Sequence, residues 1–208
     1  MVNFIVSRYN QDVSWVGQYS PSMILYDRSD DPISGSNIVP NLGTDIADKL
    51  HFIITNYGNL PPVAVYTKAN LLEKYITKEE FDEVKNNSFF TPLLTKNHKV
   101  YKDEDGSKGL KPGQDVCYYQ NGIYWEINNM WYLNEHPCKH DPKEIQAVLG
   151  IDKLEYVPFA PGSNYILTAS DIRKHPVEFY IKLYNYLTYA VYPAEAQIIE
   201  RGMYTIFR

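Results

Sequence analysis

Residues 2–10 read VNFIVSRYN, and this stretch decides the fold class because an apolar run (2–6) passes directly into a polar cluster (7–10). A short apolar run that ends in polar residues is typical of a buried strand feeding a loop. The pattern recurs twice, where SMILY (22–26) precedes DRSDD and VAVY (63–66) precedes TKAN. We therefore predict three buried strands, each ending in a polar cluster.

Helical patterns separate these strands. A short helix is expected over 12–16, with Asp12 as a possible N-cap. Apolar residues at helical spacing predict a longer helix, with Thr44 as its cap and Gly58 at its end. Thr77 and Glu80 form a capping box that starts another helix. Alternating strands and helices predict an α/β protein, with a largely parallel sheet covered by helices on both faces and a ligand crevice at the carboxyl ends of its strands.

The middle of the chain, about residues 92–142, departs from this alternation. Gln120-Asn121-Gly122 lies between two aromatic-rich runs, and Asn-Gly is typical of a hairpin turn. We expect an antiparallel excursion or a long lid. Regular structure then returns with a strand at 164–167, a helix with Pro176 in its first turn, and a last helix from about Ala194. Residues 1–208 are expected to form a single domain.

Composition excludes several classes of protein. The chain has 208 residues, of which 44% are hydrophobic, and a formal net charge of −5. This charge excludes a nucleic-acid binder that depends on bulk positive charge, so no nucleic-acid partner is expected. No apolar run is long enough to span a membrane, and the start lacks the pattern of a secretory signal. With only two cysteines, a reducing, cytoplasmic location is expected.

Four segments in order resemble the GT-A-fold glycosyltransferases, which use nucleotide sugars. They are FIVSRYN (4–10), MILYD (23–27), the Asn41-x-Gly43-x-Asp45 pattern and FAPGSNY (159–165). Nearly the whole chain is also similar to the amino-terminal glycosyltransferase domains of chlorovirus enzymes that build the capsid glycan. The resemblance implies a three-layer α/β sandwich that transfers a sugar from UDP-glucose or UDP-rhamnose to a hydroxyl of a glycan, here a viral capsid glycan in the host cytoplasm. It also implies further domains in a longer, polyprotein-like chain.

The polar strand ends supply the residues expected to hold the UDP-sugar. A carboxylate such as Asp27 can accept a hydrogen bond from the base or ribose, and Tyr9 can stack on a ring. An ordinary ion pair between neighbouring strand ends is the alternative for Arg8 and Asp27. The expected nucleotide-binding residues are Ser7, Arg8, Tyr9, Asn10, Asp27, Asn41, Gly43, Lys68 and Asn70.

A divalent cation, Mn²⁺ or Mg²⁺, is a further expectation from the resemblance. The family usually holds it with Asp-x-Asp at a strand end, whereas the corresponding strand end here reads TKAN (67–70) and has no carboxylate. The one literal Asp-x-Asp in the sequence places Asp103 and Asp105 as the expected metal ligands. The alternatives are a solvated turn at that position, ligation by Asp30 and Asp31, or Lys68 partly replacing the metal as a positive charge.

Aromatic and amide side chains around Glu126 predict a carbohydrate platform, with core packing of the tryptophans as the alternative. The expected substrate-binding residues are Trp125, Asn128, Trp131, Gly162 and Ser163, the last two from the resemblance. The catalytic candidates are Glu126 and Asp45, although complementing a helix dipole would also explain Asp45. Two other functions stay open, a non-catalytic carbohydrate-binding module and a degenerate transferase that serves as a scaffold.

Overall fold

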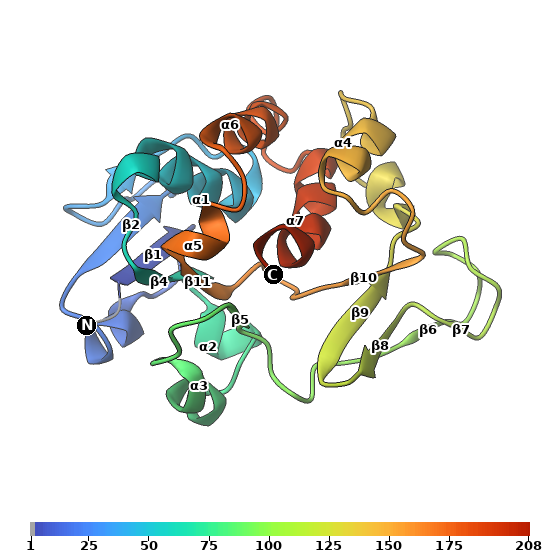
Figure 1. The fold of residues 1–208 in the computed structure, drawn as a ribbon, viewed down its shortest axis with the longest axis horizontal. Helices are drawn as coiled ribbons and strands as arrows, with labels where there is room; N and C mark the ends of the chain where they lie inside the picture. The colour runs from blue at the N-terminus through green and yellow to red at the C-terminus, as the bar shows by residue number, and fades with distance from the viewer. Residues whose placement is uncertain (1–2) are drawn as a thin grey trace.

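The computed structural model describes residues 3–208, and its centre is a six-stranded sheet (Figure 1). Its strands, in the order β3-β2-β1-β4-β11-β5, are β3 (Asn37–Ile38), β2 (Met23–Asp27), β1 (Asn3–Arg8), β4 (Val63–Lys68), β11 (Tyr165–Thr168) and β5 (Thr91–Pro92). The first four strands run parallel, whereas β11 is antiparallel to both β4 and β5. The prediction of a mostly parallel central sheet is confirmed. Val2, which we expected to begin the first strand, lies outside the described residues.

Helices cover both faces of this sheet because successive side chains of a strand point to opposite faces. Phe4 and Val6 of β1 pack into one apolar cluster, and Ile5 packs into another on the opposite side. The cluster around Phe4 includes residues of η1 (Ser14–Gln18), α2 (Leu71–Lys74) and α3 (Lys78–Val84). The cluster around Ile5 includes residues of α1 (Thr44–Thr55), α5 (Ala169–Ile172), α6 (Val177–Asn185) and α7 (Ala194–Phe207). The result is a three-layer α/β arrangement.

Helix starts follow the sequence in part. The capping box of Thr77 and Glu80 is confirmed at the start of α3. Gly43, and not the predicted Thr44, occupies the N-cap position of α1, although the Thr44 hydroxyl one position later accepts a long hydrogen bond of 3.4 Å from the Ile46 N–H. α1 also ends at Thr55 and not at Gly58, since a 3₁₀ turn, η2 (Tyr57–Asn59), follows it. The first short helix starts at Ser14, with Val13 in place of Asp12 at its N-cap.

The middle of the chain forms a second, antiparallel sheet beside the first. The Asn121-Gly122 hairpin is confirmed, with both residues at positive φ between β8 (Cys117–Gln120) and β9 (Ile123–Ile127). β10 (Tyr156–Pro158) adds a third strand on the other side of β9. β6 (Lys102–Asp103) and β7 (Gln114–Asp115) pair with each other as a separate two-stranded sheet, and η3 (Trp131–Asn134) and α4 (Pro142–Val148) complete the region. The antiparallel excursion expected from the sequence is therefore present.

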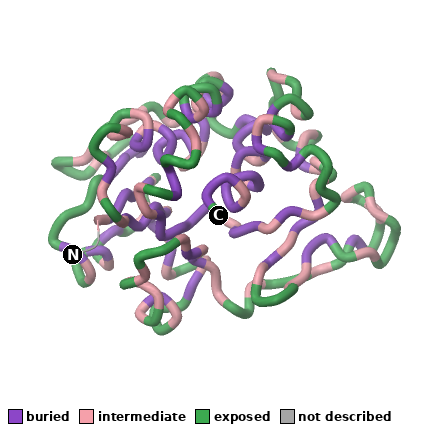
Figure 2. The backbone as a smooth tube through the Cα atoms, in the orientation of Figure 1, coloured by how far each residue is buried: buried purple, intermediate pink, exposed green. Residues whose placement is uncertain are grey.

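α7 lies between the six-stranded sheet and the three-stranded sheet of β8, β9 and β10, called the large and the small sheet below (Figure 1). The residues of α7 are buried along nearly its whole length. Figure 2 shows this burial, and it shows that the neighbouring strands are largely buried too. One apolar cluster holds Ile5 and Tyr165 of the large sheet together with Val157 of the small one. The core is thus continuous through α7. No helix within residues 3–208 is long and apolar enough to cross a membrane.

Candidate functional site

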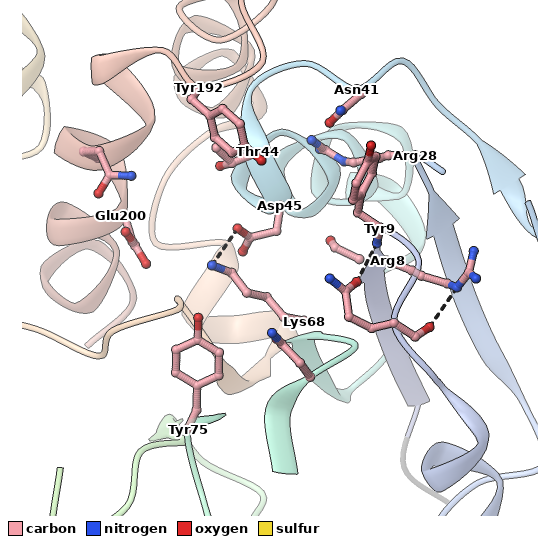
Figure 3. A pocket seen from close by; sticks show the side chains of 14 residues that line it. Arg8, Tyr9, Arg28, Asn41, Thr44, Asp45, Lys68, Tyr75, Tyr192 and Glu200 are labelled. Atoms are coloured by element: carbon pink, nitrogen blue, oxygen red, sulfur yellow. Dashed lines mark hydrogen bonds and ion pairs between the residues drawn. The ribbon is translucent and has the colours of Figure 1, made fainter. Parts of the chain in front are cut away.

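A cavity of about 260 Å³ opens at the carboxyl-terminal edge of the parallel strands (Figure 3). β1 and β4 both end at it, with Arg8 and Lys68 as their last residues. The chain passes from β1 to β2 on one side, and β4 lies on the other side of β1. Open α/β sheets leave a ligand crevice at such a switch point. Side chains from the loop after β2, from the start of α1 and from α7 complete the wall.

The end of β1 is fixed by an ion pair beneath the cavity. Arg8 Nη1 lies 2.6 Å from Asp27 Oδ2 and donates to Ser29 Oγ at 2.8 Å. Asp27 also accepts hydrogen bonds from the backbone N–H groups of Ser29 and Ile33, and it is fully buried. Although burial opposes it, this set of hydrogen bonds holds the pKa of Asp27 below its ordinary value. Arg8 lines the cavity, whereas Asp27 does not.

A second guanidinium reaches the cavity from the loop after β2. Arg28 donates to both oxygens of Asp48, at 2.8 Å and 2.7 Å, and to the carbonyl of Leu42 at 3.0 Å. This bidentate pair is almost fully buried. It joins the β2 loop to α1 and fixes the direction of the Arg28 side chain beside the cavity.

Asp45 and two lysines form the charged floor on the α1 side. Asp45 Oδ2 lies 2.6 Å from Lys49 Nζ, and its Oδ1 lies 3.1 Å from Lys68 Nζ. Burial alone would raise the pKa of Asp45, but the two ammonium groups outweigh it and lower the value to about 2. Burial lowers the pKa of Lys49, whereas for Lys68 the neighbouring carboxylates Asp45 and Glu200 outweigh burial and raise it.

Glu200 of α7 faces Asp45 across the cavity, and the sequence analysis did not single it out (Figure 3). Its Oε1 accepts a hydrogen bond from the Gly162 backbone N–H at 2.8 Å. Burial raises its pKa, and Lys68 only partly offsets that effect. The cavity therefore holds two carboxyl groups in different electrostatic surroundings.

The rim of the cavity carries tyrosines, and its wall carries one unpaired hydroxyl. Tyr9 is 43% exposed and Tyr192 is 59% exposed, so both rings are open to solvent at the mouth. Tyr75 lines the cavity below them, with Lys68 Nζ 5.6 Å from its ring centre. The Ser7 hydroxyl is buried in the wall without a hydrogen-bond partner among the described residues. The acceptor nearest in character is the buried carboxylate of Asp48, whose pKa the Ser7 hydroxyl helps to lower against the effect of burial.

The structure brings together most of the residues that we expected to hold a nucleotide. Those that line the cavity are Ser7, Arg8, Tyr9, Asn41, Lys68 and Asn70, together with the catalytic candidate Asp45. Asn10 is exposed beside the cavity without lining it, and Gly43 lies under the start of α1. For Arg8 and Asp27 the structure shows the ion pair that we weighed as the alternative.

The acceptor candidates divide between two places. Gly162 and Ser163 lie behind the cavity, where their carbonyls accept hydrogen bonds from Lys49 at 3.3 Å and 2.7 Å. Glu126 and its neighbours Trp125, Asn128 and Trp131 belong to the small-sheet region, and none of them lines the cavity. The structure thus separates the two catalytic candidates, Asp45 and Glu126.

The side chains around Glu126 hold the fold together. Glu126 is buried and pairs with Arg201 of α7, whose Nε donates to it at 2.9 Å. Asn128 donates to the carbonyls of Ile151 and Leu154. Lys108 lies 3.4 Å above the centre of the Trp131 ring and covers that face. Trp131 also packs against the main apolar cluster, so its ring belongs to the fold's packing and not to the cavity.

The two residues expected to bind a metal, Asp103 and Asp105, do not line the cavity. Their carboxylates accept hydrogen bonds from the turn in which they lie. Asp103 Oδ2 accepts from the backbone N–H groups of Lys108 and Leu110, and Asp105 accepts from Ser107. These are the hydrogen bonds of a structured turn. Within residues 3–208 no group of three or more His, Cys, Asp or Glu side chains is arranged to hold a metal ion.

Several lining residues were missed from the sequence, chiefly Arg28, Tyr75, Tyr192, Gln197 and Glu200. One signal was available for Glu200, because α7 is otherwise largely apolar and carries charged residues within its buried stretch. Ionisable residues in a buried helix are usually paired or functional. For Tyr192 the sequence offers no signal, since it lies in a loop.

Comparison of the chain with models of protein families, with curated proteins and with solved structures gave no match. The resemblance to GT-A glycosyltransferases therefore rests on the motifs of this chain alone.

Proposed function

We propose that the cavity binds a nucleoside diphosphate sugar, of the UDP-glucose or UDP-rhamnose type, and that the protein transfers the sugar to a hydroxyl of a glycan. The observation that carries the proposal is the position of Arg8 and Lys68 at the carboxyl ends of adjacent parallel strands, on either side of the switch point. This is the edge at which α/β sheets bind nucleotides, and both side chains are cations that suit a diphosphate.

Arg8 and Lys68 are each paired with a carboxylate, but neither side chain uses all of its N–H donors in that pairing. An ammonium group has three N–H donors, and Lys68 directs one of them at Asp45. A guanidinium has five, and Arg8 uses its Nε and Nη1 atoms on Gln11, Asp27, Ser29 and Asp31, which holds its guanidinium at the edge of the cavity, away from Asp45 and Glu200 (Figure 3). Their pairing with carboxylates holds these side chains in place before a ligand arrives, which lowers the ordering cost of binding.

The aromatic rim of the cavity suits the rest of such a ligand. Tyr9 and Tyr192 offer exposed ring faces on which a base or a sugar can pack. The cavity volume of about 260 Å³ lies slightly below the range of about 300–1,000 Å³ usual for small-molecule sites, so part of the ligand would extend past the rim.

The proposed transfer does not depend on a bound divalent cation. The two carboxylates of the cavity do not make a set of three ligands, and both oxygens of Asp45 face lysines. Lys68 supplies positive charge at the place where the phosphates are expected. Adding Mn²⁺ in the binding experiment tests whether the ion contributes.

Calorimetry with UDP, GDP and CMP, each with and without Mn²⁺, tests the proposal. We expect UDP to bind, and we expect Lys68→Met to weaken it by about 10- to 100-fold, because a hydrogen bond to a charged group contributes about 1.5–3 kcal/mol. Lys111→Met is the matched control, since Lys111 is exposed and lies in a loop away from the cavity. Its UDP affinity should equal that of the wild type.

The other candidate functions give different outcomes. Absence of UDP binding under every condition would rule the proposal out. Binding of UDP without any hydrolysis of UDP-glucose, with or without Mn²⁺, would instead indicate a degenerate scaffold. Binding of free glycan without nucleotide would indicate a carbohydrate-binding module.

A further inference from the structure

Two carboxyl groups line the cavity, and their surroundings prepare them for different work. Asp45 comes from the first turn of α1, and Glu200 comes from the middle of α7 (Figure 3). When two carboxyl groups share a site and their environments separate their pKa values, the environments identify which one exchanges a proton.

Both oxygens of Asp45 are occupied by cations. Lys49 Nζ lies 2.6 Å from Oδ2, and Lys68 Nζ lies 3.1 Å from Oδ1. A carboxylate that is held by two ammonium groups is a poor proton acceptor, because protonating it would leave the buried Lys49 ammonium without a charge partner and would weaken the hold on Lys68. Asp45 is therefore suited to fixing Lys68 in place.

Glu200 has one anchored oxygen and one free oxygen. Oε1 accepts the Gly162 N–H at 2.8 Å, which fixes the carboxyl plane relative to the loop before β11. Oε2 has no hydrogen bond or ion pair within residues 3–208, and the side chain is only partly buried where it lines the cavity. A carboxyl group with one oxygen fixed and the other free is positioned to accept a proton from a group that enters the cavity.

We propose that Glu200 is the general base of this site, which takes the proton of the attacking hydroxyl through Oε2, while Asp45 holds Lys68 against the leaving diphosphate. The proposal rests on the sugar transfer proposed above and names the residue that performs its proton transfer.

The proposed step forms one bond and breaks one bond at the anomeric carbon. The acceptor oxygen forms a bond to the anomeric carbon while its proton passes to Glu200. The bond from that carbon to the phosphate oxygen breaks, and UDP leaves with the bonding electron pair. Lys68 faces the negative charge that develops on the phosphate oxygen, and Glu200 then returns its proton to solvent. Water in place of the glycan hydroxyl gives hydrolysis of UDP-glucose by the same step.

The charges around Glu200 agree with this assignment. Burial raises the pKa of Glu200 above the ordinary value of a glutamate, which makes it a stronger base than an exposed carboxylate. The ionisable groups that face it from the surrounding elements are Lys68, Asp45, Lys49, Tyr75, Tyr165 and its neighbour Arg201. Lys68 and Arg201 stabilise the carboxylate, and Asp45 and burial favour the protonated form.

Glu200→Gln tests the proposal, with UDP-glucose hydrolysis as the measured reaction. Glutamine can still accept the Gly162 N–H, so we expect unchanged thermal stability and a UDP affinity within threefold of the wild type by calorimetry. The hydrolysis rate should fall by about 100-fold or more, the range of a lost general base. In the wild type, kcat/KM should rise with pH through the pKa of Glu200, and the variant should lose this rise.

A control variant and the UDP-binding measurement distinguish a failure of the Glu200 assignment from a failure of the proposed function. Glu178→Gln removes an exposed carboxylate of α6 and should hydrolyse UDP-glucose like the wild type. If UDP binds and UDP-glucose is hydrolysed, but Glu200→Gln retains its rate within threefold or its pH dependence, Glu200 is not the base. If the wild type does not bind UDP, the proposed function itself has failed. Glu200→Asp should retain a rate above that of Glu200→Gln, since a carboxylate remains.

Discussion

Lys49 is the residue on which the geometry of the cavity depends most. Its side chain is 3% exposed, and its Nζ has three partners, Asp45 Oδ2 and the carbonyls of Gly162 and Ser163. A buried ammonium is tolerated only where its charge and its donors are met. Lys49 therefore holds the start of α1 to the loop whose N–H anchors Glu200, and it sets the distance between the two carboxyl groups.

Asp45→Asn should destabilise the protein markedly. The substitution removes the charge partner of the buried Lys49, and breaking a buried pair in this way costs about 3–5 kcal/mol. Because Lys49 keeps its two carbonyl partners, we expect about 3 kcal/mol in the free energy of unfolding, measured by urea denaturation at pH 7. Asp152→Asn, at an exposed position, is the matched control and should change stability by about 0.5 kcal/mol or less. Equal effects of the two variants would show that the buried pair contributes nothing.

The ion pair of Asp45 and Lys49 should also make the free energy of unfolding depend on pH. The pKa of Asp45 is about 2 in the folded protein and about 3.8 in an unfolded chain, so the folded state favours the carboxylate. Its contribution is fully present above pH 4 and is lost as the pH falls through 2. The difference in unfolding free energy between the wild type and Asp45→Asn should thus narrow between pH 4 and pH 2. A constant difference over this range would contradict the folded-state value.

At the scale of elements, the start of α1 is held chiefly by hydrogen bonds to another loop. Gly43 has φ +69°, and Thr44 has φ +58°. Their N–H groups donate to the carbonyls of Ala190 and Val191, in the loop that carries Tyr192 to the rim. The helix start and the cavity mouth are therefore one unit.

Gly43→Ala should disturb this unit. A Cβ at position 43 would lie 2.7 Å from Leu187 Cβ and 2.9 Å from the Leu187 carbonyl oxygen, and the positive φ adds strain of about 1–2 kcal/mol. Gly113→Ala is the matched control, because Gly113 has φ +84° with open space around it. We expect a loss of about 1 kcal/mol for Gly113→Ala and more than about 2 kcal/mol for Gly43→Ala, both from urea denaturation. Similar losses would mean that the contact with Leu187 relaxes without cost.

Local chemistry explains which elements the sequence predicts correctly. The Thr77–Glu80 box and the Asn121-Gly122 turn depend on residues within three positions of each other, and both are as expected. The polar ends of β1 and β4 meet because parallel strands share an edge, so Arg8 and Lys68 could be placed together before the structure was known. Their role in binding a nucleotide stays a prediction.

What the sequence missed depends on contacts between distant parts of the chain. Glu200 reaches the cavity because α7 packs beside α1, and Gly162, 38 positions earlier in the chain, anchors it. The start of α1 was mistaken because Gly43 is set by Leu187 and Ala190 far along the chain. Glu126 looked like a carbohydrate-binding acid beside two tryptophans, but its partner is Arg201 of α7. No local pattern reveals such pairings.

At the scale of the whole molecule, α7 makes the two sheets share one core. Ile198, Ile199 and Met203 belong to the apolar cluster that also contains residues of the large sheet and of β10. The buried pair of Arg201 with Glu126 adds a polar tie from α7 to β9. Opening either sheet would expose one side of this helix. The small sheet is therefore expected to unfold together with the large one.

Tryptophan fluorescence can test this expectation because the three tryptophans of the chain report on different regions. Trp15 packs against Phe4 of the large sheet, whereas Trp125 and Trp131 lie in β9 and η3. A Trp125→Phe/Trp131→Phe variant reports on the large sheet alone, and Trp15→Phe reports on the small-sheet region. In each variant the urea midpoint from fluorescence should coincide with the midpoint from far-UV circular dichroism, as in a two-state transition. If the fluorescence of Trp125 and Trp131 changed at clearly lower urea than the circular dichroism, the small sheet would be a separate unit, and α7 would not couple it to the cavity that Glu200 lines.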